Sequence, residues 1–353
     1  MNAPPAPTSG AAAAPPGGGA GLPIPDAAAL DGAGADGAVT VSGLVKRYRE
    51  PEAVRGIDFD VAVGETFGFL GPNGAGKSTT INMLCTLVRP SAGSARVAGH
   101  DVVSERDEVR RNIGLVFQDT TLDSYLTAEL NLRFHAELYG IARNLVEPRM
   151  RQVLEMVGLW ERRQSKVMTF SGGMKRRLEI ARGLMHSPRV LFLDEPTVGL
   201  DPQTRNSIWE YIHRLRQEEE ITIFLTTHYM DEAEHCERIA IMDEGKLVAL
   251  NTPAALKASV GTDRVTIRTA DDDAALERLP GAVRTSEGIV IGAEDGEAYV
   301  PSLFASLGIP ITNVSISKPT LDDVFLSYTG RTIRDSEQQG KGMPPFFAAM
   351  ARR

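Results

Sequence analysis

Residues 71–79 read Gly71-Pro72-Asn73-Gly74-Ala75-Gly76-Lys77-Ser78-Thr79, between an apolar run and a helical pattern. The segment fits G-x-x-x-x-G-K-[ST] in the strand–loop–helix context that this pattern requires. Glycines let backbone N–H groups curl around phosphate oxygens, and the helix start adds the positive end of its dipole. We therefore predict a phosphate-binding loop made of these nine residues, in which Lys77 reaches the β- and γ-phosphates and Ser78 ligates Mg²⁺.

Four short apolar runs share one layout, in which the run ends abruptly in glycine or polar residues. They are residues 67–70 before Gly71, 113–117 before Gln118, 190–193 before Asp194, and 221–225 before Thr226, Thr227 and His228. Such runs are typical of buried parallel strands. Since ligands bind outside the carboxyl ends of the strands in open parallel sheets, we expect the four endings to line one crevice.

Asp194 and Glu195 supply a second half for such a site, because they directly follow a predicted strand. Asp194 can hold Mg²⁺ through water, and Glu195 can polarise the water that attacks the γ-phosphate. An acidic pair after a strand is by itself also compatible with a helix cap or a loop. The phosphate loop in the same chain favours the nucleotide site.

A serine and two glycines open another predicted helix, at Ser171-Gly172-Gly173. Ser171 is a good N-cap, and the glycines leave the first amides of the helix uncovered. The helix has one apolar face, made of Met174, Leu178, Ala181 and Met185. In isolation this segment indicates a capped structural helix, and only the order of the motifs along the chain changes that interpretation.

The remaining chain divides by composition and periodicity. Residues 1–38 are mostly Ala, Pro and Gly, with too little apolar bulk to offset the entropy of ordering, so we expect a disordered tail. The core domain is predicted over 39–260, with strands at 39–48 and 57–63 and a hairpin over 239–250. A helical lobe, about 119–187, is indicated by apolar residues spaced by four, namely Leu126, Leu130, Phe134 and Leu138.

A second unit is predicted over residues 261–330. Its pattern is strand, helix, strand, strand, helix, strand, followed by a helix over 321–328, and the βαββαβ order fits a small ferredoxin-like α+β domain. The tail over 331–353 is basic, and we expect a frayed terminus there; membrane or partner docking is the alternative.

The composition narrows the function classes. With 42% hydrophobic and 24% charged residues the chain is neither a coiled-coil rod nor wholly disordered, and a net charge of -8 argues against general binding to nucleic acid. Two cysteines are too few for a disulfide framework, which favours a reducing compartment. We expect the chain neither to span a membrane nor to be secreted, because it has no long apolar run and no signal peptide.

The order of these motifs resembles the ABC ATPase family over residues 39–260. The order is phosphate loop, Gln118, the Ser171 helix, Asp194-Glu195-Pro196-Thr197, Gly199-Leu200-Asp201-Pro202, and Thr226-Thr227-His228. The resemblance implies an α/β P-loop NTPase fold, with a RecA-like core, an antiparallel β subdomain and a helical lobe. A closer likeness, to the daunorubicin/doxorubicin-resistance type of exporter ATP-binding subunit, is carried by Phe170-Ser171-Gly172-Gly173-Met174-Lys175-Arg176-Arg177-Leu178 and by Lys318-Pro319-Thr320-Leu321-Asp322-Asp323-Val324-Phe325-Leu326-Ser327-Tyr328-Thr329-Gly330.

The resemblance also implies roles for single residues. Tyr48 matches the aromatic residue that stacks on adenine, and Gln118 matches the glutamine that senses Mg²⁺ and the attacking water. Asp201 matches the residue that communicates between paired sites, and His228 matches the γ-phosphate switch. Met174 stands where the family usually has Gln, which removes a side-chain hydrogen bond but leaves the backbone donors and the preceding serine.

By the same resemblance, two chains stack head to tail, so that ATP is held between Lys77 of one and Ser171 of the other. The implied activity is Mg²⁺-dependent ATP hydrolysis through Glu195. Transport would need a separate membrane permease, contacted by the helical lobe after Gln118, with this chain as a peripheral protein on the cytoplasmic side. Drug or antibiotic efflux is the favoured function; export of lipid, polysaccharide or another cargo, and a soluble ABC ATPase not involved in transport, stay open.

One group of residues could be mistaken for a metal cluster: His228, Asp231, Glu232, His235 and Cys236. On a helix, positions 228, 232 and 235 share a face. We favour a solvated, acidic helix start over a metal site, because acidic residues are common at helix N-termini.

Overall fold

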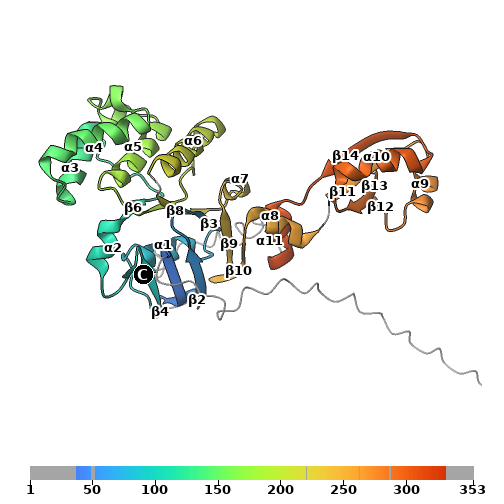
Figure 1. The fold of residues 1–353 in the computed structure, drawn as a ribbon, viewed down its shortest axis with the longest axis horizontal. Coiled ribbons are helices and arrows are strands. Elements are labelled where there is room, and N and C mark those ends of the chain that lie inside the picture. The colour runs from blue at the N-terminus through green and yellow to red at the C-terminus, as the bar shows by residue number, and fades with distance from the viewer. Residues whose placement is uncertain (1–36, 49–51, 220, 262, 286–287, 331–353) are drawn as a thin grey trace, which may run out of the picture.

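The computed structural model describes residues 37–48, 52–219, 221–261, 263–285 and 288–330. The tails predicted over 1–38 and 331–353 lie outside these ranges, apart from Gly37 and Ala38. Figure 1 shows one larger body and a smaller one joined to it at α8 and α11. None of the helices in the described ranges is both long and apolar enough to cross a bilayer.

A six-stranded sheet forms the centre of the larger body. The four predicted strands are neighbours in it, parallel to one another in the order β3-β8-β7-β6, which confirms the prediction that their carboxyl ends share one edge. The order continues from β3 through β9 to β10, whose antiparallel pairing confirms the predicted hairpin. The strands are β3 (Thr66–Leu70), β6 (Ile113–Val116), β7 (Val190–Asp194), β8 (Thr222–Thr227), β9 (Arg238–Asp243) and β10 (Lys246–Asn251).

A second, antiparallel sheet has the order β2-β1-β4-β5. Helix α1 (Lys77–Leu84) contacts strands of both sheets. The two sheets pack together through buried phenylalanine rings. Phe59 of β2 contacts Phe67, Phe69 and Phe224 of the six-stranded sheet, and the ring centroids in this group lie 5.0 to 6.0 Å apart. The strands are β1 (Val39–Arg47), β2 (Glu52–Val61), β4 (Ala92–Val97) and β5 (His100–Asp101), and α2 (Arg106–Asn112) follows them.

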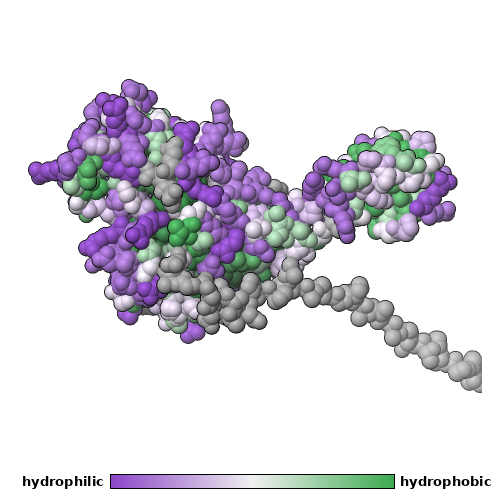
Figure 2. Space-filling view, in the orientation of Figure 1, coloured by the Kyte–Doolittle hydropathy of each residue, from purple (hydrophilic) through white to green (hydrophobic). Residues whose placement is uncertain are grey.

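The predicted helical lobe contains α3 (Ala128–Leu138), α4 (Arg143–Met156) and α5 (Gly172–Leu184), with 3-10 turns at Trp160–Arg162 and Val167–Thr169. The side chains that α3 buries include Ala128, Leu132 and Ala136. Leu130, Phe134 and Leu138 are 47%, 61% and 66% exposed. The spacing of four therefore marks a surface stripe and not the core of the lobe, and Figure 2 shows hydrophobic residues on the surface at this end of the molecule.

The smaller body is a four-stranded antiparallel sheet of order β12-β13-β11-β14. This order, in a βαββαβ chain, is the ferredoxin-like arrangement, as predicted. It has its own core, built from residues such as Val265, Ile267, Ile289, Leu303 and Leu307. The elements are β11 (Asp263–Thr269), α9 (Asp272–Arg278), β12 (Val283–Thr285), β13 (Gly288–Ala293), α10 (Gly296–Leu307) and β14 (Ile311–Ser317).

The last helix, α11 (Leu321–Thr329), returns to the larger body. It packs on α8 (Pro253–Val260), and its buried residues Leu321, Val324 and Phe325 belong to the hydrophobic cluster of the six-stranded sheet and the helical lobe. The sequence pattern grouped this helix with the second unit, whose core cluster does not include its residues. Two further helices complete the larger body, α6 (Pro202–Glu219) and α7 (Met230–Ala233).

We predict that Phe325→Ala destabilises the larger body by about 3–5 kcal/mol, because it removes a fully buried aromatic side chain from that core. Both tryptophans of the chain, Trp160 and Trp209, lie in the larger body, so their fluorescence during urea unfolding reports its stability. The matched control is Leu326→Ala, at a side chain that is 45% exposed, with an expected change within about 0.5 kcal/mol. An equal effect of the two substitutions would contradict the packing of α11 on this body.

Candidate nucleotide-binding site

The phosphate loop has the backbone geometry that its glycines permit. Gly74 and Gly76 adopt φ values of 84° and 109°, which L-residues with side chains rarely adopt. A Cβ atom at Gly76 would lie 2.4 Å from the carbonyl oxygen of Ala53, so a side chain does not fit there. The loop therefore approaches neighbouring backbone closely and turns its following residues directly into α1.

Lys77 is held at the centre of this loop. Its Nζ donates hydrogen bonds to the carbonyl oxygens of Gly71, at 2.7 Å, and Pro72, at 3.1 Å, and it lies 3.4 Å from Glu195 Oε1. The side chain is only 4% exposed. The ammonium group is thus positioned between the loop carbonyls and the carboxylate that follows β7.

Three elements bring oxygen atoms together around Asp194. Its Oδ1 accepts hydrogen bonds from Ser78 Oγ of α1, at 3.0 Å, and from Thr226 Oγ1 of β8, at 2.5 Å. Hard cations such as Mg²⁺ prefer carboxylate, hydroxyl and phosphate oxygens, usually with water in the remaining positions. Ser78 and Asp194 therefore fit a magnesium site beside a phosphate bound in the loop.

Glu195 carries a strained backbone and a paired carboxylate. Its φ of 45° is in the left-handed region, and its N–H donates to Thr226 Oγ1 at 3.0 Å. Glu195 Oε1 lies 3.3 Å from His228 Nδ1. Burial alone would raise the pKa of Glu195, but His228 and Lys77 outweigh it and lower the pKa below its ordinary value. The carboxylate is therefore ionised at neutral pH and available to accept a proton, and strain of this kind is common at functional sites.

Two of the other predicted residues come from neighbouring elements, β6 and α5. Gln118 follows β6 and its side chain is exposed. Ser171 caps α5, where its Oγ accepts the N–H of Met174 at 3.2 Å. Figure 1 shows α5 in the helical lobe, apart from α1. One chain thus brings together the loop, Asp194, Glu195 and His228, while α5, which begins after Ser171, lies apart from α1.

Asp201 lies beside that helix start. It caps α6 by accepting the N–H of Thr204 at 3.0 Å and its hydroxyl at 2.6 Å, and these bonds lower the pKa of Asp201. A Cβ atom at Gly173 would lie 2.3 Å from Thr204 Cγ2. The glycines after Ser171 therefore permit close packing of α5 against the start of α6.

Tyr48 stands at the end of β1 and is 48% exposed, with Lys46 Nζ 5.0 Å from the centre of its ring. The neighbouring strand β2 begins close to the phosphate loop, because the carbonyl of Ala53 packs against Gly76. An exposed aromatic ring near the loop is suited to stacking on a base.

Arg176, which the sequence did not single out, joins the parts of the site. This buried guanidinium donates to the carbonyl oxygens of Pro196 at 2.6 Å, Asp194 at 3.0 Å, and Phe117, and it pairs with Glu179 at 3.2 Å. It therefore ties α5 to the ends of β6 and β7. No local signal identifies it, because it is one of several basic residues in the helix.

The turn between β9 and β10 also holds the phosphate loop. Gly245 donates its N–H to the carbonyl of Ala75 at 2.9 Å and accepts the N–H of Arg55 at 2.7 Å. The hairpin that the sequence predicted as a closing element thus fixes the loop against β2. A short Glu-Gly turn in the sequence gives no sign of that contact.

The predicted solvated helix start after His228 is wrong for Glu232. Asp231 is exposed, but Glu232 is only 1% exposed and accepts the hydroxyls of Thr197 and Thr227. The reason is that α7 packs against β3 and β8, which turns this one carboxyl inward. Within the described ranges, no group of three or more His, Cys, Asp or Glu side chains is arranged to hold a metal ion.

Two family models match the chain. The ABC transporter model matches residues 54–198, and the model for the C-terminal domain of DrrA1-3-like ATP-binding proteins matches residues 252–329. The second match begins at α8 and ends at α11, the two helices that pack together.

Three curated proteins illustrate the similarity. The chain is 40% identical to the linearmycin resistance ATP-binding protein LnrL of Bacillus subtilis, with 83% of this chain and 98% of that protein covered. It is 40% identical to the daunorubicin/doxorubicin resistance ATP-binding protein DrrA of Streptomyces peucetius, with 84% and 94% covered. It is 38% identical to the Nod factor export ATP-binding protein I of Ralstonia nicotianae, with 86% and 97% covered.

Two solved structures are similar to the larger body. One is cbiO1 from Clostridium perfringens, part of the ABC transporter complex cbiONQ, with a TM-score of 0.60, 29% identity, and 63% of this chain and 91% of that chain covered. The other is a dimeric ATP-binding cassette, MJ0796, in a post-hydrolysis state bound to ADP and Pi, with a TM-score of 0.55, 27% identity, and 61% and 98% covered.

Proposed function

This chain belongs to the family of ABC transporter ATP-binding proteins, and we propose that it hydrolyses ATP to energise the export of drugs or antibiotics through a separate membrane permease. One observation carries the proposal. A phosphate loop, a magnesium-type oxygen cluster and the Glu195–His228 pair converge at one sheet edge, in a chain that is 40% identical over most of its length to two resistance proteins.

The chain's own residues divide the work of hydrolysis. The loop amides and Lys77 hold the β- and γ-phosphates, with the ammonium exchanging its contact with the Gly71 carbonyl for phosphate oxygens. Glu195 orients the attacking water and accepts its proton, and His228 fixes Glu195 and faces the γ-phosphate. Ser78, Asp194 and Gln118 would hold Mg²⁺, which would neutralise phosphate charge.

Two copies of the chain complete each nucleotide site in this proposal. Ser171 and Gly172 are exposed at the start of α5, where a helix N-terminus suits an anion, and α5 lies apart from α1 of the same chain (Figure 1). A head-to-tail dimer would bring the Ser171 helix start of one copy to the loop of the other. The similar ATP-binding cassette MJ0796 is dimeric in its solved structure, which supports the pairing of two copies.

We predict that Glu195→Gln dimerises on addition of ATP and Mg²⁺, because it keeps the binding groups but lacks the carboxylate that accepts the proton. Sedimentation of the purified variant with and without ATP measures the mass. Lys77→Ala is the control, expected to stay a monomer because its phosphate contact is gone. A monomer mass for Glu195→Gln at saturating ATP would contradict the proposed dimer.

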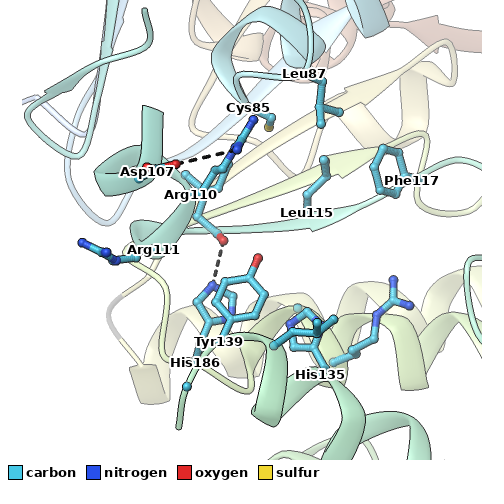
Figure 3. A pocket seen from close by; sticks show the side chains of 15 residues that line it. Cys85, Leu87, Asp107, Arg110, Arg111, Leu115, Phe117, His135, Tyr139 and His186 are labelled. Atoms are coloured by element: carbon cyan, nitrogen blue, oxygen red, sulfur yellow. Dashed lines mark hydrogen bonds and ion pairs between the residues drawn. The ribbon is translucent and has the colours of Figure 1, made fainter. Parts of the chain in front are cut away.

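We further propose that the permease docks at a cleft of about 670 Å³ between α2, β6, α3 and α5. Figure 3 shows Arg110, Arg111, Tyr139 and His186 around it. Arg182 adds a third guanidinium, and Asp107 is the one carboxylate among the lining residues, so the cleft favours an acidic group. The exposed stripe of α3 continues from it through Leu138. The fitting partner is an amphipathic segment with an acidic residue, on the cytoplasmic side of the membrane.

This cleft is connected to the nucleotide site through α5. Arg182 donates to the carbonyl of Thr121, at 3.0 Å, and to its hydroxyl, at 2.5 Å, while Glu179 accepts the N–H of Thr121 at 2.8 Å. Thr121 follows Gln118 by three residues. A partner that moves Arg182 would therefore move the segment that carries Gln118.

We predict that Phe134→Asp abolishes copurification of the permease, since a charge in the middle of the apolar stripe would be desolvated on docking. Pull-down of the tagged subunit from membranes, after coexpression with its permease, measures binding. Leu145→Asp on α4 is the control, because this side chain is also exposed, at 55%, but lies on another helix. Equal recovery of the permease with both variants would argue against this docking surface.

The cargo class is tested by resistance. Expression of the chain with its permease in a sensitive bacterial host is expected to raise the inhibitory concentration of daunorubicin or linearmycin, and Lys77→Ala is expected to remove the effect because turnover is lost. Growth assays with both compounds measure it. Unchanged sensitivity, with ATP hydrolysis intact, would favour another exported cargo, such as the Nod factor named for one relative.

A further inference from the structure

A buried carboxyl joins two loops of the nucleotide site. Glu232 of α7 is 1% exposed, and its two oxygens take different partners: Oε1 accepts the hydroxyl of Thr197, and Oε2 accepts the hydroxyl of Thr227 at 2.7 Å. Thr197 is 35 residues away from Glu232 in the sequence and Thr227 is five residues away, and all three side chains are buried. Glu232 is therefore a built-in connection between the end of β8 and the loop after β7.

Both threonines are adjacent to functional residues. Thr197 lies two residues after Glu195, in the segment that leads to Asp201, and Thr227 directly precedes His228. The hydroxyl of Thr227 also accepts the N–H of Tyr229 at 2.9 Å, so it fixes the backbone on both sides of His228. A change in the Glu232 contacts would consequently alter the separation of Glu195 and His228, now 3.3 Å between Oε1 and Nδ1.

We propose that Glu232 is a positioning residue for ATP hydrolysis. It keeps Glu195 and His228 at their present separation through its hydrogen bonds with the hydroxyls of Thr197 and Thr227, which we call the Glu232 clasp. The inference rests on the roles proposed above for Glu195 and His228. It assigns Glu232 no contact with the nucleotide. The carboxyl acts only through the two hydroxyls.

The surroundings of Glu232 make the clasp sensitive to protonation. Burial raises its pKa from 4.5 to about 7, although Thr227, Arg205 and His228 act in the opposite direction. The ionised carboxylate accepts from both hydroxyls, whereas the protonated acid must donate to one of them. The charged or titratable groups that face it come from α6, α5, the ends of β7 and β8, and the residues after α7: Arg205, Arg176, Glu195, His228 and Cys236.

Steady-state ATP hydrolysis by the full chain tests the proposal. Glu232→Ala is expected to lower kcat about 10- to 100-fold with little change in KM for ATP, because the reacting groups are misplaced while the phosphate loop is intact. Glu232→Gln is expected to restore kcat in part, to the level that the wild type reaches when its carboxyl is protonated, since the amide, like the acid, accepts from one hydroxyl and donates to the other. Asp231→Ala, at the exposed neighbouring carboxylate, is the matched control and should behave as wild type.

The pH dependence supplies a readout that a purely structural role would not move. Wild-type kcat is expected to fall below about pH 7, where the carboxylate is protonated, and Glu232→Gln is expected to lack this inflection. The free energy of unfolding of the wild type changes with pH in the direction opposite to kcat. Because the folded pKa lies above the ordinary value of 4.5, the wild type loses stability relative to Glu232→Gln as pH rises from 4.5 to about 7.

Thr197→Val and Thr227→Val keep the test decisive if Glu232→Ala does not fold, since each removes one hydroxyl at constant size. Each should lower kcat, and neither should add to the effect of Glu232→Gln, because all act on one clasp. Wild-type kcat in Glu232→Ala, additive effects of the threonine variants, or equal loss in Glu232→Ala and Glu232→Gln would overturn the inference. A wild-type chain that does not hydrolyse ATP would overturn the proposed function itself.

Discussion

The parallel pairing of β3, β8 and β7 is the constraint on which the site depends. In-register neighbours place Leu70 beside Thr227 and Asp194 beside Thr226, so three strands present their polar ends at one edge. The hydroxyl of Thr226 both donates to Asp194 and accepts the backbone N–H of Glu195. The groups proposed to hold the metal and to accept the proton are thus linked by one hydroxyl of β8, in the buried part of the sheet.

The helical lobe communicates with this edge through buried polar contacts. Arg176 donates hydrogen bonds to three backbone carbonyls at the ends of β6 and β7. A buried carbonyl without a hydrogen-bond partner would lower the stability of the fold. Further along α5, Glu179 and Arg182 hold the segment after Gln118. The same helix therefore follows Ser171 at its start, contacts the residues proposed for hydrolysis in its middle and borders the proposed permease cleft near its end.

The ferredoxin-like part has its own hydrophobic core but is attached to the larger body by two helices. The ferredoxin-like sheet has its own core, but the chain enters it from α8 and leaves it into α11, which pack on each other and on the larger body. The sheet is therefore attached to the side of the larger body that carries β10 and α8. The family match over 252–329 covers these two helices together with the sheet, which agrees with their acting as one attached element.

Local sequence determined the phosphate loop, the four parallel strands and the polar residues at their ends, because glycine conformation, short apolar runs and strand termini are encoded within a few neighbouring positions. It also determined the βαββαβ order of the smaller body. Only the tertiary structure decided that the stripe of α3 faces outward, that α11 belongs with α8, and that Arg176 and Glu232 are buried against the site. Those outcomes depend on which distant surfaces meet, and a buried charge is distinguished from an exposed one by partners far away in the chain.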